Sequence, residues 1–433
     1  MFAYCVSFQA NQVAISRGAR VFLKLGSFVA ALALSIILTS RLAAADALHS
    51  WVQLGPDNEL IARVITQSPD CPELLVDGRS IKMSLRAGRE ALFPENVCER
   101  RLPQSSQQIS LDGKQLPVPS PDIQRIVVMG DTGCRIRRNR IQDCNNPAAW
   151  PIKTIAKEIA VKSPDLIVHV GDYIYRSMAC PIPAKCQGSP YGDNFQGWSA
   201  DWLDPAADLY PIAPFVFLRG NHENCGRGDQ GWFRYLAPRT VPVECPAVTE
   251  PWSASIDGIN LIVFDASDGS SPESNPKLMP EYRRMAMKMF ADVSGETWLL
   301  THRPLWANMR AFGELINGDD TQRAAFGYII PEPVSLIVSG HIHAFQTIDL
   351  ANGPVQLISG NSGTQLDPMP TSSANDIEVA GSVANTVIND SGFGFVLFTR
   401  EKAGSWLMDV IDVNGDLRHR CQLVARALSC NLQ

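Results

Sequence analysis

The clearest structural pattern in this chain is the stretch Leu166-Ile167-Val168-His169-Val170-Gly171-Asp172-Tyr173-Ile174-Tyr175. Residues 166–170 are mostly apolar and branched, and the run stops at a polar cluster. This pattern predicts a buried β-strand. Asp172 follows its carboxyl end, which is where open α/β sheets place their functional groups. A Gly-Asp pair after one strand is also ordinary turn chemistry, so this stretch alone does not distinguish a site from a turn.

The same arrangement recurs four times elsewhere in the chain. In each case a short apolar run precedes a polar motif: Gly130-Asp131-Thr132-Gly133, Gly220-Asn221-His222-Glu223, Leu299-Leu300-Thr301-His302 and Gly340-His341-Ile342-His343. Five such motifs at predicted strand ends are hard to explain as turns. His341 and His343 alternate at period two, so they reach one site only if the chain turns there, which Gly340 permits.

The motifs supply carboxylate, amide and phenol oxygens together with imidazole nitrogens, and no thiolate. This set suits hard or borderline cations. Two cations about 3.5–4 Å apart can clamp the entering and leaving oxygens of a displacement at phosphorus. Cations that close need a carboxylate between them to offset their repulsion, and Asp172 is the candidate. Tyr175 indicates one of the metals, because a phenol of pKa about 10 binds as phenolate at neutral pH only to a strongly acidic cation. Ferric iron meets that demand better than zinc or manganese.

The order GDxG, GDxxY, GNHE, xxxH, GHxH resembles the purple acid phosphatase branch of the calcineurin-like metallophosphoesterases, over roughly residues 121 to 345. Gly133 stands where many relatives have a metal-binding histidine, and Tyr175 compensates. The resemblance implies an α/β fold with a four-layer αββα sandwich. It also implies that the ferric ion is held by Asp131, Asp172, Tyr175 and His343. The divalent ion, which can be iron, zinc or manganese, is expected on Asp172, Asn221, His302 and His341.

The resemblance further implies an acid phosphomonoesterase in which a metal-bound hydroxide attacks a phosphate monoester. His222 is then a catalytic residue that contacts the phosphate and protonates the leaving alkoxide. Arg176 follows the second motif and is a predicted phosphate-binding residue, with a surface salt bridge as the alternative. Arg135 is a further candidate. Two other functions remain open: a phosphodiesterase with two divalent metals, and a non-catalytic surface binding protein that metals only stabilise.

Three residues near the motifs have ordinary structural explanations. His169, inside its predicted strand, is expected to be a hydrogen-bonded core residue. Asp265 ends an apolar run and is expected to form a turn or to orient a ligand. Tyr173 competes with Tyr175 as the phenolate, but only the spacing of Tyr175 matches the family.

The beginning of the chain resembles a targeting segment, predicted to span residues 1–45. Arg17, Arg20 and Lys24 precede the apolar residues 25–39, and small residues at 43–45 offer a cleavage site. The apolar part is short for a membrane span, although an uncleaved anchor remains the alternative. We therefore expect a secreted or periplasmic protein without stable membrane insertion.

Cysteine usage agrees with export. One of the eleven cysteines, Cys5, lies in the predicted targeting segment and leaves an even number, which in an exported chain indicates disulfides. Sequence does not determine the connectivity. Pairing of neighbours is our prediction: Cys71–Cys98, Cys134–Cys144, Cys180–Cys186, Cys225–Cys245 and Cys421–Cys430.

The net charge is −6, and no basic stripe appears, so a small phosphate ester rather than nucleic acid is the expected partner. Residues 46–120 contain short strand patterns between turns and predict a small β-rich, sandwich-like domain, followed by a catalytic domain over 121–433. Residues 153–162 and 280–291 are predicted helices. The polar residues 368–391 are predicted to form a loop.

Overall fold

The computed structural model describes residues 47–269, 275–311, 314–327, 330–369 and 372–431. The predicted targeting segment 1–45 therefore lies outside the described residues. Within these ranges two large β-sheets dominate, and no helix is long and apolar enough to cross a membrane.

The first sheet is mixed, and its described strands number eleven. Their spatial order is β27 (Ala427–Asn431), β26 (Leu417–Val424), β25 (Ser405–Asp412), β24 (Gly394–Lys402), β9 (Arg125–Met129), β12 (Leu166–His169), β13 (Phe215–Phe217), β1 (Ala47–Leu54), β2 (Glu59–Thr66), β6 (Asn96–Pro103) and β5 (Ser84–Ala87). Parallel pairing joins β9 to β12, β12 to β13 and β13 to β1. The carboxyl ends of β9, β12 and β13 therefore meet at one edge.

The second sheet has eight described strands. Their order is β14 (Trp252–Ile256), β15 (Ile259–Phe264), β16 (Glu296–Thr301), β19 (Val334–Ser339), β21 (Val355–Ser359), β20 (Phe345–Leu350), β23 (Ser382–Asp390) and β22 (Ser372–Val379). Parallel pairing of β15, β16 and β19 brings their carboxyl ends together. The loop predicted over 368–391 is wrong, because β22 and β23 form an antiparallel hairpin there.

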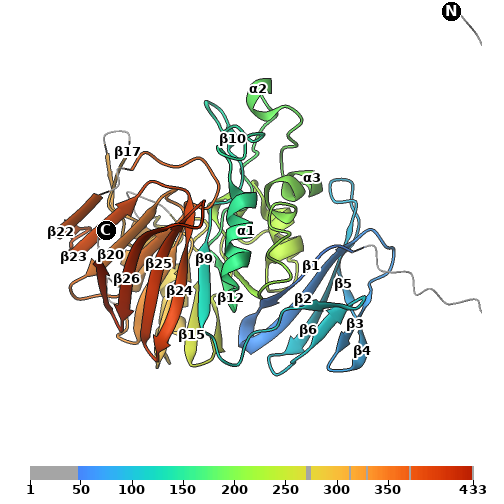
Figure 1. The fold of residues 1–433 in the computed structure, drawn as a ribbon, viewed down its shortest axis with the longest axis horizontal. Helices are drawn as coiled ribbons and strands as arrows, with labels where there is room; N and C mark the ends of the chain where they lie inside the picture. Colours follow the sequence, from blue (N-terminus) through green and yellow to red (C-terminus); the bar gives the residue numbers. More distant parts are fainter. Residues whose placement is uncertain (1–46, 270–274, 312–313, 328–329, 370–371, 432–433) are drawn as a thin grey trace, which may run out of the picture. The chain divides into compact units, whose positions relative to one another are not determined.

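Alternating side chains of the described residues sort into three large cores and two small ones, and the large ones confirm the αββα prediction. Val128 and Val168 of the first sheet share a core with Leu261 and Leu300 of the second, so this core lies between the sheets. Their neighbours in sequence face outward. Those of the first sheet pack with α1 (Ile152–Lys162), and those of the second with α5 (Met279–Phe290) and α6 (Asp320–Phe326). Figure 1 shows α1 beside β9 and β12.

The β-rich region ahead of β9 is present. A four-stranded sheet, β4 (Arg79–Lys82), β3 (Glu73–Val76), β7 (Ile109–Leu111) and β8 (Lys114–Leu116), packs its buried side chains into the core shared with β2 and β6. In addition, β1 extends the first large sheet through pairing of Gln53 with Phe215. The division of the chain into domains at residues 120 and 121 stays a prediction.

All five predicted disulfides are present: Cys71–Cys98, Cys134–Cys144, Cys180–Cys186, Cys225–Cys245 and Cys421–Cys430. Two of them brace segments beside the site, because Cys134 follows the first motif and Cys225 follows the third. Smaller elements around the same edge are β10 (Ile136–Arg137), β11 (Arg140–Ile141), α2 (Pro183–Cys186), α3 (Phe195–Trp198), β17 (Met309–Ala311) and β18 (Glu314–Ile316).

Candidate metal centre

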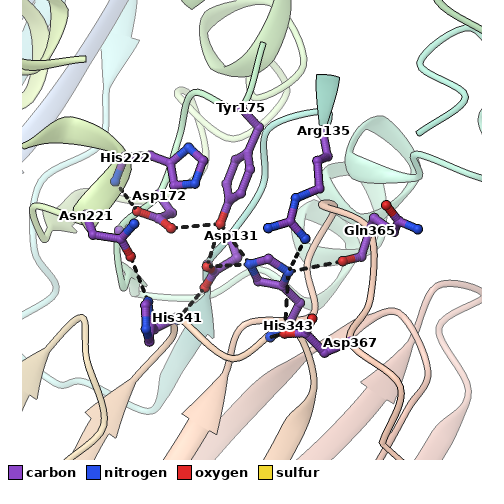
Figure 2. A network of polar contacts seen from close by, with 12 residues as sticks. Asp131, Arg135, Asp172, Tyr175, Asn221, His222, His341, His343, Gln365 and Asp367 are labelled. Carbon is purple, nitrogen blue, oxygen red and sulfur yellow. Dashed lines mark hydrogen bonds and ion pairs between the residues drawn. The ribbon is translucent and has the colours of Figure 1, made fainter. Parts of the chain in front are cut away.

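The residues predicted from the five motifs lie together beyond the carboxyl ends of the two sheets. Asp131 follows β9, Tyr175 follows β12 and Asn221 follows β13, while His302 follows β16. His341 and His343 lie in the turn between β19 and β20. The site is therefore built from strand ends of both sheets, and Figure 2 shows most of these side chains converging.

The backbone at the site is unusual, because Asp131, Asp172 and His341 have positive φ angles of 55°, 60° and 72°. Non-glycine residues adopt this region at a cost that the surrounding structure must offset, and such residues cluster at functional sites. The chain turns after Gly340 as expected, although His341, not Gly340, adopts the left-handed conformation. Gly340 is needed for space instead: a Cβ there would lie 2.4 Å from Oδ2 of Asp131.

Gly133 also has a steric explanation. A Cβ at this position would lie 2.4 Å from the carbonyl oxygen of Tyr173 and 2.9 Å from the nitrogen of Tyr175. The loop that carries Tyr175 therefore passes where the side chain of residue 133 would be. This backbone therefore has no room for a histidine at position 133.

The first group of ligand atoms surrounds the phenol oxygen of Tyr175. Its Oη lies 2.7 Å from Oδ2 of Asp172, 2.9 Å from Oδ1 of Asp131 and 2.9 Å from Nε2 of His343. Nδ1 of His343 donates to the carbonyl oxygen of Gln365 at 3.1 Å, so Nε2 presents a lone pair. A phenol has one proton and cannot hydrogen-bond three acceptors. Asp131, Asp172 and His343 instead bring their ligand atoms close enough together to hold a metal ion, which the phenol oxygen could also contact.

The second group contains Asp172, Asn221, His302 and His341. Nε2 of His302 lies 3.3 Å from Oδ1 of Asp172 and 3.2 Å from Oδ1 of Asn221, and Nδ1 of His341 lies 2.7 Å from the same amide oxygen. Nδ1 of His302 donates to the carbonyl oxygen of Val170 at 2.7 Å, which fixes the tautomer with a free Nε2. Two sets of acidic and imidazole groups close enough to hold a metal ion thus share one residue, Asp172.

The electrostatics of the cluster without metals show a deficit of positive charge. Burial and the nearby Asp172 carboxylate raise the pKa of Asp131 well above its usual value. Burial would also raise the pKa of Asp172, but His302 and His222 hold it well below normal. Burial and both carboxylates raise the pKa of the Tyr175 phenol. Multivalent cations would reverse the shifts of Asp131 and Tyr175 and add to that of Asp172, because they favour the ionised forms of all three groups.

Glu223 holds the loops of the site in place, a role that the sequence pattern did not reveal. Its carboxylate accepts four backbone N–H groups: those of Tyr173 (2.8 Å) and Ile174 (3.2 Å) at Oε1, and those of Asp172 (3.0 Å) and Gly220 (3.0 Å) at Oε2. It therefore links the segment after β12 to the segment after β13. Finding it requires knowing that these two strands are neighbours.

The change Glu223→Gln should destabilise the protein by about 2–4 kcal/mol, because the new amide turns donors toward buried N–H groups that then lack an acceptor. The measurement is the free energy of unfolding in urea. Glu244→Gln makes the same substitution at an exposed position and serves as the control. An equal effect of the two substitutions would contradict the assigned role.

The arginines near the site differ in their partners. Arg176 is buried, and its Nε donates to Oδ1 of Asp201 at 2.5 Å, while its guanidinium lies over the Trp150 ring. This salt bridge is buried, not the surface salt bridge named as the alternative, and the role of Arg176 in binding substrate stays a prediction. Arg135 instead reaches toward Nδ1 of His343 at 3.4 Å, and Figure 2 shows it across the Tyr175 ring from His222.

Two further arginines, not anticipated from the sequence, contact the site histidines. Arg227 donates to Nε2 of His222 at 2.9 Å, and the guanidinium of Arg303 lies 3.2 Å from Nε2 of His341. Nδ1 of His222 lies 2.8 Å from the carbonyl oxygen of Ile174 and must donate to it. Arg227 follows His222 by five residues in an irregular loop, so spacing alone gave no reason to select it.

The residues with ordinary explanations have the expected environments. His169 is buried and lies 3.1 Å from the Thr132 hydroxyl, and Tyr173 directs its hydroxyl to the Leu218 carbonyl oxygen at 3.0 Å. Asp265 accepts the backbone N–H of Ser267 at 3.0 Å, which forms the expected turn, and also the backbone N–H and the hydroxyl of Thr249, each at 2.8 Å. None of the three enters the cluster around Asp172.

Residues 124–345 match the family described as calcineurin-like phosphoesterase, and because this match covers about half of the chain, the protein belongs to that family. It is therefore a metal-dependent phosphoric ester hydrolase, and its paired ligand groups support a binuclear metal centre. Its fold is similar to that of purple acid phosphatase PPD1 from seeds of yellow lupin, Lupinus luteus. That match has a TM-score of 0.57 and 15% identity, and it covers 88% of this chain and 75% of the lupin chain.

A dimetal phosphatase from Danio rerio is also similar, with a TM-score of 0.41, 8% identity, and coverage of 70% of this chain and 99% of that chain. No curated protein sequence matches this chain.

Proposed function

We propose that the protein is an exported acid phosphomonoesterase with a mixed Fe(III)–M(II) centre. The observation that carries this proposal is the pair of ligand groups that share Asp172. In the proposed assignment the ferric ion is held by Asp131, Asp172, Tyr175 and His343. The divalent ion, iron, zinc or manganese, is held by Asp172, Asn221, His302 and His341.

The donor set fits these ions. Two carboxylates and a phenolate place three negative charges opposite about five positive ones, which leaves a surplus that attracts a phosphate dianion. The chemistry that two such cations supply is charge neutralisation on phosphoryl oxygens and activation of a water molecule.

The residues of the chain itself supply orientation and proton transfer. The ring of His222 stacks on Tyr175 with 3.7 Å between centroids, so His222 faces the cluster without joining the ligand groups. In this position it can contact the phosphate and the leaving oxygen. Arg176 is retained as a second phosphate contact, since it borders the same space as His222. Five disulfides support export, because such bonds persist in oxidising compartments.

The proposal is tested with purified full-length protein by elemental analysis and by hydrolysis of p-nitrophenyl phosphate and bis-p-nitrophenyl phosphate at pH 4–8. We expect two ions per chain, one of them iron, and higher kcat/KM for the monoester. Colourless protein that prefers the diester would favour the phosphodiesterase. Metal-loaded protein inert on both esters would favour the binding protein. Fewer than two ions in fully active protein would contradict a binuclear centre.

Replacing the phenol gives a spectroscopic test of the ferric ligand. The change Tyr175→Phe should abolish the visible absorption that arises from phenolate-to-iron charge transfer, while Tyr173→Phe should retain it. The two residues are both fully buried, so they form a matched pair. Unchanged colour in Tyr175→Phe would dismiss its role as a ligand.

A further inference from the structure

A cleft of about 550 Å³ lies beside the metal centre on the side of His222. Its charged lining residues are Arg137, Arg176, Arg227, Asp193 and Asp229. His222 belongs both to the cleft and to the cluster, because its backbone N–H donates to Oδ1 of Asp172 at 2.8 Å. An ester whose phosphoryl group lies at the proposed metal centre can therefore direct its leaving group past His222 into this cleft.

Two of the three arginines have no carboxylate partner among the described residues. The guanidinium of Arg227 donates to the carbonyl oxygen of Asn221 (2.8 Å) and to His222, both of which are neutral groups. Arg137 extends from β10 into the cleft and is exposed. Partial burial and the nearby Arg227, Arg138 and Arg135 lower its pKa.

The acidic groups of the cleft already have partners of their own. Asp193 accepts from Nε1 of Trp198 and from the backbone N–H of Gln230, each at 2.8 Å, and from the N–H of Gly231 at 3.1 Å. Burial raises the pKa of Asp193 to about 6, so it loses negative charge in acid. Asp229 accepts the N–H of Gly226 at 2.9 Å. Arg176 is paired with Asp201, which leaves Arg137 and Arg227 as the cations available to a ligand.

We propose that this cleft is a second anion-binding subsite, in which Arg137 and Arg227 hold a negatively charged group on the leaving side of the substrate. The inference rests on the proposed function and names its substrate class: phosphate esters that carry a second phosphate or a carboxylate. A guanidinium matches both anions with two parallel donors, and charge-assisted bonds of this kind are about twice as strong as neutral ones. A cleft of this size accommodates a small organic phosphate.

The test compares two pairs of esters. Glucose 1,6-bisphosphate against glucose 6-phosphate examines a second phosphate, and 4-carboxyphenyl phosphate against phenyl phosphate examines a carboxylate. In the native protein we expect kcat/KM to favour the doubly anionic ester about tenfold in at least one pair. Arg137→Gln should reduce that preference to less than about threefold. The pair that responds identifies the anion.

Arg138→Gln is the matched control, because it removes the same charge from the adjacent residue, which does not line the cleft. It should retain the preference. Glucose 1,6-bisphosphate has two scissile phosphates, which alone give a twofold preference. A native preference of twofold or less, or an equal loss of preference in Arg137→Gln and Arg138→Gln, would overturn the subsite but not the proposed phosphatase activity. If the native protein hydrolysed none of the four esters, the proposed function would be overturned, and the subsite with it.

Discussion

The change Asp172→Asn is expected to lower kcat/KM for p-nitrophenyl phosphate about 1000-fold, which corresponds to about 4 kcal/mol of transition-state stabilisation. Oδ2 of Asp172 contacts the phenol oxygen of Tyr175, and Oδ1 lies beside Nε2 of His302. An asparagine keeps one oxygen, so at least one ligand group loses its donor. It also removes the charge that lies between the two proposed cations.

Elemental analysis after dialysis should accompany the kinetics and should show fewer than two ions per chain. Asp367→Asn is the control, because Asp367 accepts the backbone N–H of His343 at 3.1 Å from outside the ligand groups. A residue that only orients a ligand should cost about 10-fold to 100-fold. If Asp172→Asn retained two ions and a tenth of the native activity, Asp172 would not be the bridge.

The ends of the strands at the site could be predicted from the sequence, because the strand pattern and the ligand that follows it lie in one short segment. In β9, β12 and β19, a run of branched residues stops within two or three residues of a ligand, so strand and ligand are read from one short segment. The five disulfides were predicted for a similar reason, since their cysteines lie 6 to 27 residues apart. Short loops close more readily than long ones.

What was missed depends on contacts between distant segments. The role of Glu223 exists only because β12 pairs with β13, and the roles of Arg227 and Arg303 depend on which histidine each loop approaches. The β22–β23 hairpin was mistaken for a loop because β22 exposes most of its residues and therefore reads as polar. Its turn at Ala380 and Gly381 has positive φ at both residues, and hairpin rules that look for Asn-Gly or Asp-Gly do not select an alanine there.

The second large effect is expected at His222. The change His222→Ala should reduce kcat by about 100-fold or more if the imidazole protonates the leaving oxygen. Burial lowers the pKa of His222 to about 3, with Asp172 opposing and Arg227 adding to the effect. The imidazole is therefore neutral above that pH. The proton that it passes on must then arrive with the substrate, and a phosphate monoester loses its second proton near pH 6. Native activity should accordingly fall as the pH rises through about 6.

The position of Arg227 suggests a second role for His222, and the His222→Ala variant can distinguish the two roles. Nε2 of His222 accepts a hydrogen bond from Arg227, so His222 has two possible uses: to carry a proton or to orient that guanidinium toward the phosphate. Proton transfer matters most for a poor leaving group. An acid role therefore predicts a much larger loss in His222→Ala for an alkyl phosphate than for p-nitrophenyl phosphate. His49→Ala, which removes an imidazole paired with Asp204, should leave both rates unchanged. Equal losses on the two esters would assign His222 to phosphate binding alone.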